Sequence, residues 1–525
     1  MSTVLASVAA VLLSIAIAQL GNGMLSSLVG LRLAVEGVST IAIGLVGAAH
    51  FVGWIIGAAT AQRVIVRVGH IRAFSAFAAI GSVAILSLGF FLDLVGWALL
   101  RVVTGYCMAA LFMTAESWLN SASTNQTRGK VLSAYIISLN LALAGGQFLL
   151  TLEDVRMPLL YALAAMALSL ALVPLALTRS LTPEIHAAPR LGLLSLWRVS
   201  PLGLAAVVSS GLIIGSIQGG MGAVFARGIG LDTAGVSAFV ATVFLGGLFL
   251  QWPVGWLSDR IDRRRVLAGA AIMVTIGSLV VMAGAGGMPQ AETPADGVLA
   301  GSGLLAGIIP EGTAIWLLFI GAVIVGGAGY ALYPVATAHV NDLVEPGRMI
   351  AAAGGLVLGG GLGSAIGPIM ASGIMSLVGP SGLFAWAVLA GAGLAAFALY
   401  RARIRPQVPA SAKTPAVVSP RTTPAVTVMA TDISGAESPL ESDEAMMAAA
   451  TAESAVEPVV VPETVVLRNG DVPRGTADRF AESARKAISD EEEGGPDNEK
   501  RATDGSAAPD RDGADASAPK DDQAR

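Results

Sequence analysis

The stretch GWLSDRIDRRR, residues 255 to 265, is unusually rich in charge for this chain. Its last seven residues hold two acids and four arginines, whereas only 13% of all 525 residues are charged and 54% are hydrophobic. A soluble globular protein carries about 25% charged residues, so the composition indicates a membrane protein. The charged stretch then marks a point where the chain leaves the hydrocarbon.

Twelve apolar runs are each close to the ~20 residues with which an α-helix crosses a ~30 Å hydrocarbon core while satisfying its own backbone groups. The predicted fold class is therefore an all-α membrane protein with twelve transmembrane helices. The first run is longer than the apolar region of a signal peptide and follows no basic residue, so we expect a retained helix and no removed targeting segment. The runs lie near residues 4–31, 38–61, 73–92, 95–118, 131–152, 157–177, 201–224, 235–257, 266–286, 313–336, 350–373 and 382–400.

The basic residues orient these helices. Up to Arg405 the chain holds 20 Lys plus Arg, of which 16 lie in even-numbered connections or after the last span and only Arg32, Arg156 and Arg227 lie in odd-numbered ones. Because Lys and Arg stay on the cytoplasmic side during insertion, we expect a multi-pass protein of the inner (plasma) membrane with both termini in the cytoplasm.

Residues 406–525 differ from the rest, with 12 Lys plus Arg against 23 Asp plus Glu and very few aromatic residues. Such a composition buries too little surface to offset the entropy of ordering. It predicts a disordered acidic cytoplasmic tail, either a plain solvated extension or a docking segment for a protein partner.

The rest of the chain contains an internal repeat. The matches at an offset of 193 are Phe51 with Phe244, Gly53 with Gly246, Arg67 with Arg260 and Arg72 with Arg265, and those at 221 include Leu111 with Leu332 and Asn120 with Asn341. We therefore predict an N-terminal six-helix lobe (1–177), a cytoplasmic linker (178–200) and a C-terminal six-helix lobe (201–405). Secondary transporters built from such repeats bind their substrate between the halves near the bilayer midplane.

The charged stretch resembles the cytoplasmic loop signature of the major facilitator superfamily, G-x-x-x-D-R-x-G-R-R. Gly255, Asp259, Arg260, Arg263 and Arg264 match it, while Asp262 stands where the signature has its second glycine. The resemblance covers residues 1–405 and implies two pseudo-symmetric six-helix bundles that work by alternating access. ESWL at 116–119 and RGKVLSAY at 128–135 are similar to the YcaD-type bacterial branch.

The resemblance also implies a cytoplasmic latch that favours the outward-facing state. In the first half Val66 stands at the aspartate position, so we expect Glu116 to supply the acid and to pair with Arg67 or Arg72. A substrate or proton role is the alternative for Glu116. The predicted latch residues are Asp259, Arg260, Arg263, Arg264, Glu116, Arg67 and Arg72.

Ionisable groups at membrane depth usually face a cavity. Arg101, which with Gly105 is similar to the R-x-x-x-G of the family's fourth helix, lies 15 residues or about 22 Å from Glu116 on one helix. Arg101 therefore needs another partner: a bound anion, helix carbonyls or neutral hydrogen-bonding groups. The first span has no acid, which disfavours a cation exporter, and an anionic or neutral amphipathic solute fits better.

Polar groups on the helices that line the cavity in the resembled fold complete the predicted substrate site: Gln19, Asn22, Arg101, Gln218, Tyr330 and Tyr333. Asn140, Gln147 and Gln251 either line it or hold helices together, and we favour the second role. His50, with an ordinary pKa near ~6.5, is the proton-coupling candidate, and a neutral interhelical hydrogen bond is its alternative role.

The sequence thus predicts a proton-coupled secondary transporter of a small solute. An uncoupled facilitator and a transporter-like receptor or scaffold that signals through its tail remain as alternatives. No enzyme is expected, because Gly129-Lys130 lacks a phosphate loop's preceding glycine and no G-x-S-x-G or H-E-x-x-H occurs. The expected partners of this monomer are a small-molecule substrate, protons and lipid, with no nucleic acid, metal or cofactor.

Overall fold

The computed structural model describes residues 2–123, 127–177, 192–288, 310–345 and 348–404. All regular elements within these ranges are helices, and they form twelve continuous helical stretches, some built from consecutive segments, that are long and apolar enough to cross a membrane. The predicted all-α class with twelve transmembrane helices is confirmed. The tail, residues 406–525, and most of the predicted linker, residues 178–191, lie outside the described residues.

The first six spans are formed by eight helical segments. Asp93 caps the fourth of them, since its side chain accepts a hydrogen bond from the Gly96 backbone N–H. The segments are α1 (Ser2–Val35), α2 (Thr40–Val68), α3 (His70–Leu88), α4 (Leu94–Ala122), α5 (Arg128–Phe148) with the 3₁₀ turn η1 (Leu149–Leu152), α6 (Pro158–Leu170) and α7 (Leu172–Ala176).

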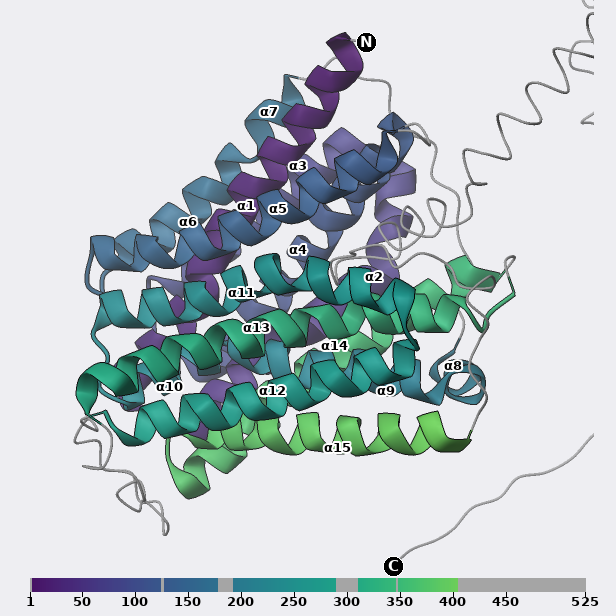
Figure 1. Cartoon of the computed structure of the whole chain (residues 1–525). Helices are drawn as coiled ribbons and strands as arrows, with labels where there is room; N and C mark the ends of the chain where they lie inside the picture. Colours follow the sequence, from purple (N-terminus) through teal and green to yellow (C-terminus); the bar gives the residue numbers. More distant parts are fainter. Residues whose placement is uncertain (1, 124–126, 178–191, 289–309, 346–347, 405–525) are drawn as a thin grey trace, which may run out of the picture. The chain divides into compact units, whose positions relative to one another are not determined.

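The short α8 (Leu193–Val199) precedes the second half. Figure 1 shows four helices of that half, α11, α13, α12 and α15, running side by side. The segments are α9 (Pro201–Ser216), the π-helical turn η2 (Ile217–Met221), α10 (Gly222–Gly228), α11 (Thr233–Arg260), α12 (Arg263–Gly286), α13 (Glu311–Asn341), α14 (Met349–Val378) and α15 (Gly382–Ile404).

The two halves repeat one helix contact. In the first, α4 approaches α2 so closely that a side chain at Gly105 would overlap the carbonyl oxygen of His50. In the second, Gly326 of α13 stands in the same way against the carbonyl oxygen of Val243 on α11. Gly326 follows Gly105 by 221 residues and Val243 follows His50 by 193, the two offsets of the sequence repeat.

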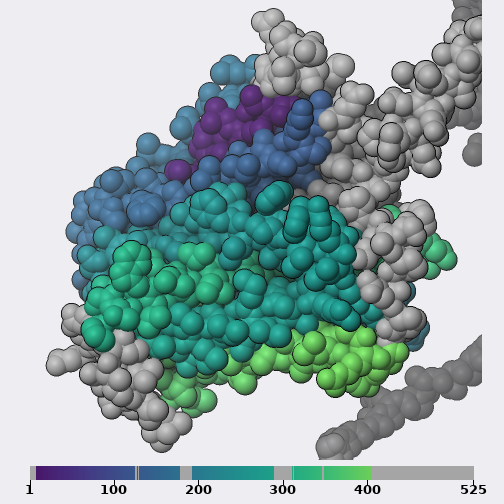
Figure 2. Space-filling view, in the orientation of Figure 1, coloured from purple at the N-terminus to yellow at the C-terminus, as the bar shows by residue number. Residues whose placement is uncertain are grey.

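The halves meet through α2 against α14 and α5 against α11; the second contact lies on the face seen in Figure 2, where blue α5 adjoins teal α11. Near the end where α2 begins, Gly47 of α2 faces the carbonyl oxygen of Gly219 with no room for a Cβ. The chain breaks its helix there, since Gly220 has φ 97°, a conformation that glycine adopts at little cost. We call this end of the bundle, with Gly44, Gly47, Gly219 and Ser372, the closed end.

The charged stretch 255–265 is almost entirely helical, and only Ile261 and Asp262 separate α11 from α12. In the first half the corresponding separator is Gly69, whose φ is +86°. Asp262 stands 193 residues later with φ −58°, a conformation open to any residue, and its side chain accepts from the Arg264 backbone N–H to cap α12. The turn at this position therefore does not need a residue with positive φ, and Asp262 can stand where the signature has glycine.

Candidate functional site

A cavity of about 130 Å³ lies between the two halves. Helices α1, α2, α4 and α5 of the first half and α9, η2, α11, α13 and α14 of the second half contribute to its wall. The wall is formed by Gln19, Asn22, Ser26, His50, Phe51, Trp54, Arg101, Phe112, Ile136, Leu139, Asn140, Leu143, Ile214, Gln218, Gln251, Tyr330, Tyr333, Val357, Gly360, Gly361 and Ser364.

All six residues predicted for the substrate site lie on this one wall, and so does His50. Asn140 and Gln251 also line the cavity, although we expected these two residues mainly to hold helices together. Gln147 lies elsewhere: it accepts a hydrogen bond from Ser27 Oγ at 2.6 Å and donates one to the Gly23 carbonyl oxygen. It joins α5 to α1.

Arg101 brings a permanent positive charge to the wall. Its side chain is 1% exposed, and its Nε and Nη1 have no hydrogen-bond partner among the described residues. None of the described residues that line the cavity carries a carboxylate. The cavity therefore contains a buried guanidinium with no carboxylate among the described residues of its wall.

His50 lies close to Arg101, because Gly105, which touches the His50 carbonyl, is one helical turn beyond Arg101 on α4. His50 is 6% exposed, and its Nδ1 has no hydrogen-bond partner among the described residues. By the repeat offsets, His50 corresponds to Val243 and Arg101 to Ala322. The same helix contact thus forms in the second half without an ionisable group at either of these two positions.

Neutral polar side chains in the cavity are partly paired with one another. Gln218 Nε2 donates to Tyr330 Oη at 2.7 Å, which joins the seventh span to the tenth. Asn22 Nδ2 donates to Gln19 Oε1 at 3.1 Å one turn away on α1. These groups offer further donors and acceptors to a bound solute.

Aromatic side chains form much of the remaining wall. The rings of Trp54 and Phe112 lie 5.3 Å apart, and Phe51 and Tyr333 also face the cavity. The sequence pattern does not indicate Trp54, Phe51 or Phe112, because aromatic residues in an apolar helix carry no signal that separates a cavity wall from a lipid-facing or packed surface.

The predicted latch residues of the second half form an ionic cluster within that half. Arg263 Nη1 donates to Asp342 Oδ1 at 2.9 Å, and Nη2 to Asp259 Oδ1 at 3.4 Å. Arg264 pairs with Asp262 at 2.8 Å, and Arg260 lies over the Trp256 ring at 3.6 Å. These contacts join α11, α12 and α13.

Burial alone would raise the pKa of Asp262. The hydrogen bonds from the Arg264 side chain and backbone N–H, together with the charges of Arg264 and His339, outweigh it and hold the pKa below its ordinary value. Asp262 therefore stabilises the α11–α12 junction as a carboxylate.

Glu116, which we expect to pair with Arg67 or Arg72, lies in a contact between α4 and α5. Glu116 is fully buried and accepts a hydrogen bond from Tyr135 Oη of α5 at 2.9 Å. Arg67 and Arg72 have exposed side chains. Arg67 lies on the last turn of α2, where it points to the surface rather than into the lobe.

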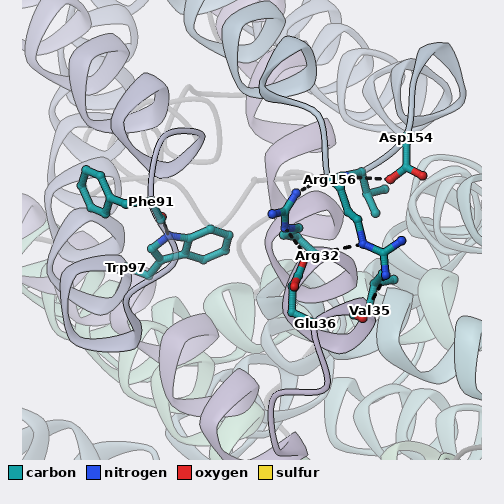
Figure 3. A network of polar contacts seen from close by, with 8 residues as sticks. Arg32, Val35, Glu36, Phe91, Trp97, Asp154 and Arg156 are labelled. Atoms are coloured by element: carbon teal, nitrogen blue, oxygen red, sulfur yellow. Dashed lines mark hydrogen bonds and ion pairs between the residues drawn. The ribbon is translucent and has the colours of Figure 1, made fainter.

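A second charged cluster lies at the closed end, in the first half (Figure 3). Glu36 pairs with Arg32 at 3.2 Å and with Arg156 at 3.5 Å, and the guanidinium groups also donate to the backbone oxygens of Val35 and Val155. The cluster fixes the end of α1 to the connection before α6. Two of the three basic residues in the odd-numbered connections thus have a structural role.

Within the described residues no group of three or more His, Cys, Asp or Glu side chains is arranged to hold a metal ion. The single cysteine, Cys107, is buried. The donors of the cavity are instead nitrogen and hydroxyl groups suited to an organic solute.

The family model described as Major Facilitator Superfamily matches residues 11–291 and 206–452. The chain belongs to the major facilitator superfamily. Its curated relatives include the uncharacterized MFS-type transporter YcaD of Escherichia coli O17:K52:H18 (strain UMN026 / ExPEC) and the uncharacterized MFS-type transporter Ent638_1421 of Enterobacter sp. (strain 638). Each is 28% identical over 361 residues, which are 68% of this chain and 86% of the relative. The resemblance to the YcaD-type branch is confirmed.

Solved structures of transporters share the fold. The nucleoside transporter NupG has a TM-score of 0.60 at 11% identity, over 77% of this chain and 100% of that one. A bacterial homologue of the human lysosomal transporter Spinster, in an inward-facing and occupied conformation, has a TM-score of 0.54 at 14% identity, over 76% and 96%. Family membership supports a membrane transporter.

Proposed function

We propose that the protein is a secondary transporter that carries a small solute through the central cavity by alternating access, coupled to protons through His50. The observation that carries the proposal is the cavity itself, whose wall is drawn from both halves of the sequence and combines polar and aromatic groups. A site of this kind between two repeated halves opens to alternate sides when the halves rock.

The contacts between the halves support the rocking. At the closed end, Gly44 and Gly47 of α2 lie against Ser372 and the carbonyl oxygen of Gly219 without space for a side chain. These contacts consist of small residues and backbone. Such a surface separates without leaving a buried charge behind. By the distribution of basic residues, the closed end faces the outside.

Spin labels test this motion. Ile41 at the start of α2 and Leu377 at the end of α14 are 47% and 63% exposed, so both accept a label in a Cys107→Ala background. We expect two label distances whose populations change between pH 5.5 and pH 7.5, the range in which histidine titrates. A control pair at Ile41 and Phe91, both in the first half, should keep one distance.

His50→Ala should abolish the pH dependence of the two populations while both distances persist. His70→Ala is the matched control, because His70 contacts Ser117 on α4 and does not line the cavity. A single distance for the Ile41–Leu377 pair at every pH would contradict alternating access. Two populations that respond to pH in His50→Ala as in the parent would remove His50 from the mechanism.

A further inference from the structure

The charge balance of the cavity is unusual for a binding site buried in a membrane protein. Arg101 is 1% exposed, and two of its three nitrogens lack a hydrogen-bond partner among the described residues. A guanidinium cannot escape this position by losing its proton, because it stays charged in proteins. A buried charge without a partner is costly unless some opposite charge reaches it.

No carboxylate of the described cavity wall supplies that opposite charge. The cavity wall holds none, and Glu116, on the same helix, lies about 22 Å along the axis from Arg101. The tyrosine and amide groups of the wall are neutral, and Gln218 and Tyr330 are already paired at 2.7 Å. An opposite charge that reaches Arg101 through the cavity must therefore come from a bound solute.

Packing does not account for the arginine either. The second half makes the corresponding contact between α11 and α13 with Ala322 at the position of Arg101, and Ala322 is fully buried. A small apolar residue thus satisfies the same position in the repeat. The arginine is an addition to the fold rather than a requirement of it.

We propose, on the basis of the proposed function, that the transported solute is a small organic anion with an apolar or aromatic body, bound through its carboxylate or similar group by Arg101. The fork of guanidinium N–H groups matches a carboxylate in two parallel hydrogen bonds. Trp54 and Phe112, with rings 5.3 Å apart, face the same cavity and provide the apolar surface for the body of the solute.

Three aromatic probes of similar shape and different charge test the proposal: benzoate, benzamide and benzylammonium. Their binding to the purified full chain is followed by the shift in apparent melting temperature, since a ligand that binds the folded state raises it. We expect benzoate to bind at least about tenfold more tightly than benzamide, as expected for a hydrogen bond to a charged group. Benzylammonium should bind more weakly still.

Arg101→Met should remove the preference for benzoate, and Arg101→Lys, which keeps the charge without the fork, should retain part of it. The Lys variant shows whether a loss in the Met variant comes from charge or from a damaged cavity. Equal shifts from benzoate and benzamide, a stronger shift from benzylammonium, or a preference that survives in Arg101→Met would each overturn the proposal.

The failure of this proposal is distinguishable from the failure of the transport proposal. Spin-label distances that interconvert in a protein without a preference for benzoate would leave a transporter for some other solute. A benzoate preference that depends on Arg101, in a protein whose labels keep one distance, would leave an anion-binding site and remove alternating access.

Discussion

Arg101 and Arg263 are two equally buried arginines, 1% and 2% exposed, in very different surroundings. Arg263 is held by Asp342 and Asp259 at 2.9 and 3.4 Å, at the junction of α11, α12 and α13. Arg101 faces a cavity in which no described residue offers a carboxylate. A buried charge with its partner in the same lobe joins helices, whereas one that lacks such a partner is available to a ligand.

The first half shows that the fold does not require an ionic junction. His70 stands 193 residues before Arg263, and its Nε2 lies 3.1 Å from Ser117 Oγ of α4. The same junction of helices is therefore closed by a neutral hydrogen bond in one half and by a buried ion pair in the other. The ion pair makes the end of the second half more sensitive to the loss of a single charge.

The largest expected effect comes from breaking that pair. Arg263→Met leaves the Asp342 carboxylate, whose side chain is 2% exposed, buried without its cation. Removing one partner of a buried pair costs about 3–5 kcal/mol. We expect the unfolding free energy to fall by that amount, measured by thermal or denaturant unfolding of the purified protein.

Arg260→Met is the matched control, because Arg260 is exposed and lies on the Trp256 ring. It should cost no more than about 1 kcal/mol. The double change Arg263→Met with Asp342→Leu should recover most of the stability, because it removes both charges together. Equal losses in Arg263→Met and Arg260→Met would show that the pair contributes little.

The second effect has the opposite sign. Arg101→Met replaces a buried charge by an apolar side chain of similar length, and such replacements of buried ionic groups are neutral or stabilising by about 1–4 kcal/mol. We expect the ligand-free protein to unfold at the same temperature or a higher one. A loss as large as that of Arg263→Met would mean that Arg101 is paired within the protein, and the comparison of the two arginines would fail.

The sequence alone predicted the twelve spans and the repeat, because the bilayer imposes a minimum apolar length and each half carries matching loop residues. It also selected Gln19, Arg101, His50 and Tyr330, because polar groups stand out in apolar helices. The aromatic wall at Trp54 and Phe112 carried no such signal, since the fold alone decides which apolar side chains meet in a cavity.

The surroundings of Glu116 could not be predicted from the sequence for a related reason. Charge counting brings an acid toward the nearest arginines, but the end of α4 turns Glu116 inward to Tyr135 while Arg67 and Arg72 stay exposed. The direction in which a side chain points depends on how its helix is rotated about its axis. Apolar residues occur on every face of α4, so the sequence does not indicate that rotation.

The smallest effect concerns Asp262, the residue that departs from the loop signature. Its pKa is held below the ordinary value, so its ionisation stabilises the folded state above about pH 4 and that contribution is lost as the pH falls further. Asp262→Asn removes the charge but retains an oxygen that accepts from the Arg264 N–H, whereas Asp262→Ala removes the helix cap as well.

Loss of the pair with Arg264 should cost less than about 1 kcal/mol, and loss of the cap about 1 kcal/mol more. Asp262→Asn should therefore lie between the parent and Asp262→Ala at pH 7 and should approach the parent as the pH falls below about 4. If Asn and Ala are equally destabilising at pH 7, the cap contributes nothing and the charge alone holds the turn. If Asp262→Asn matches the parent at pH 7, the ion pair with Arg264 is dispensable. The stabilising part of the cluster around α12 would then be Arg263 with its carboxylates.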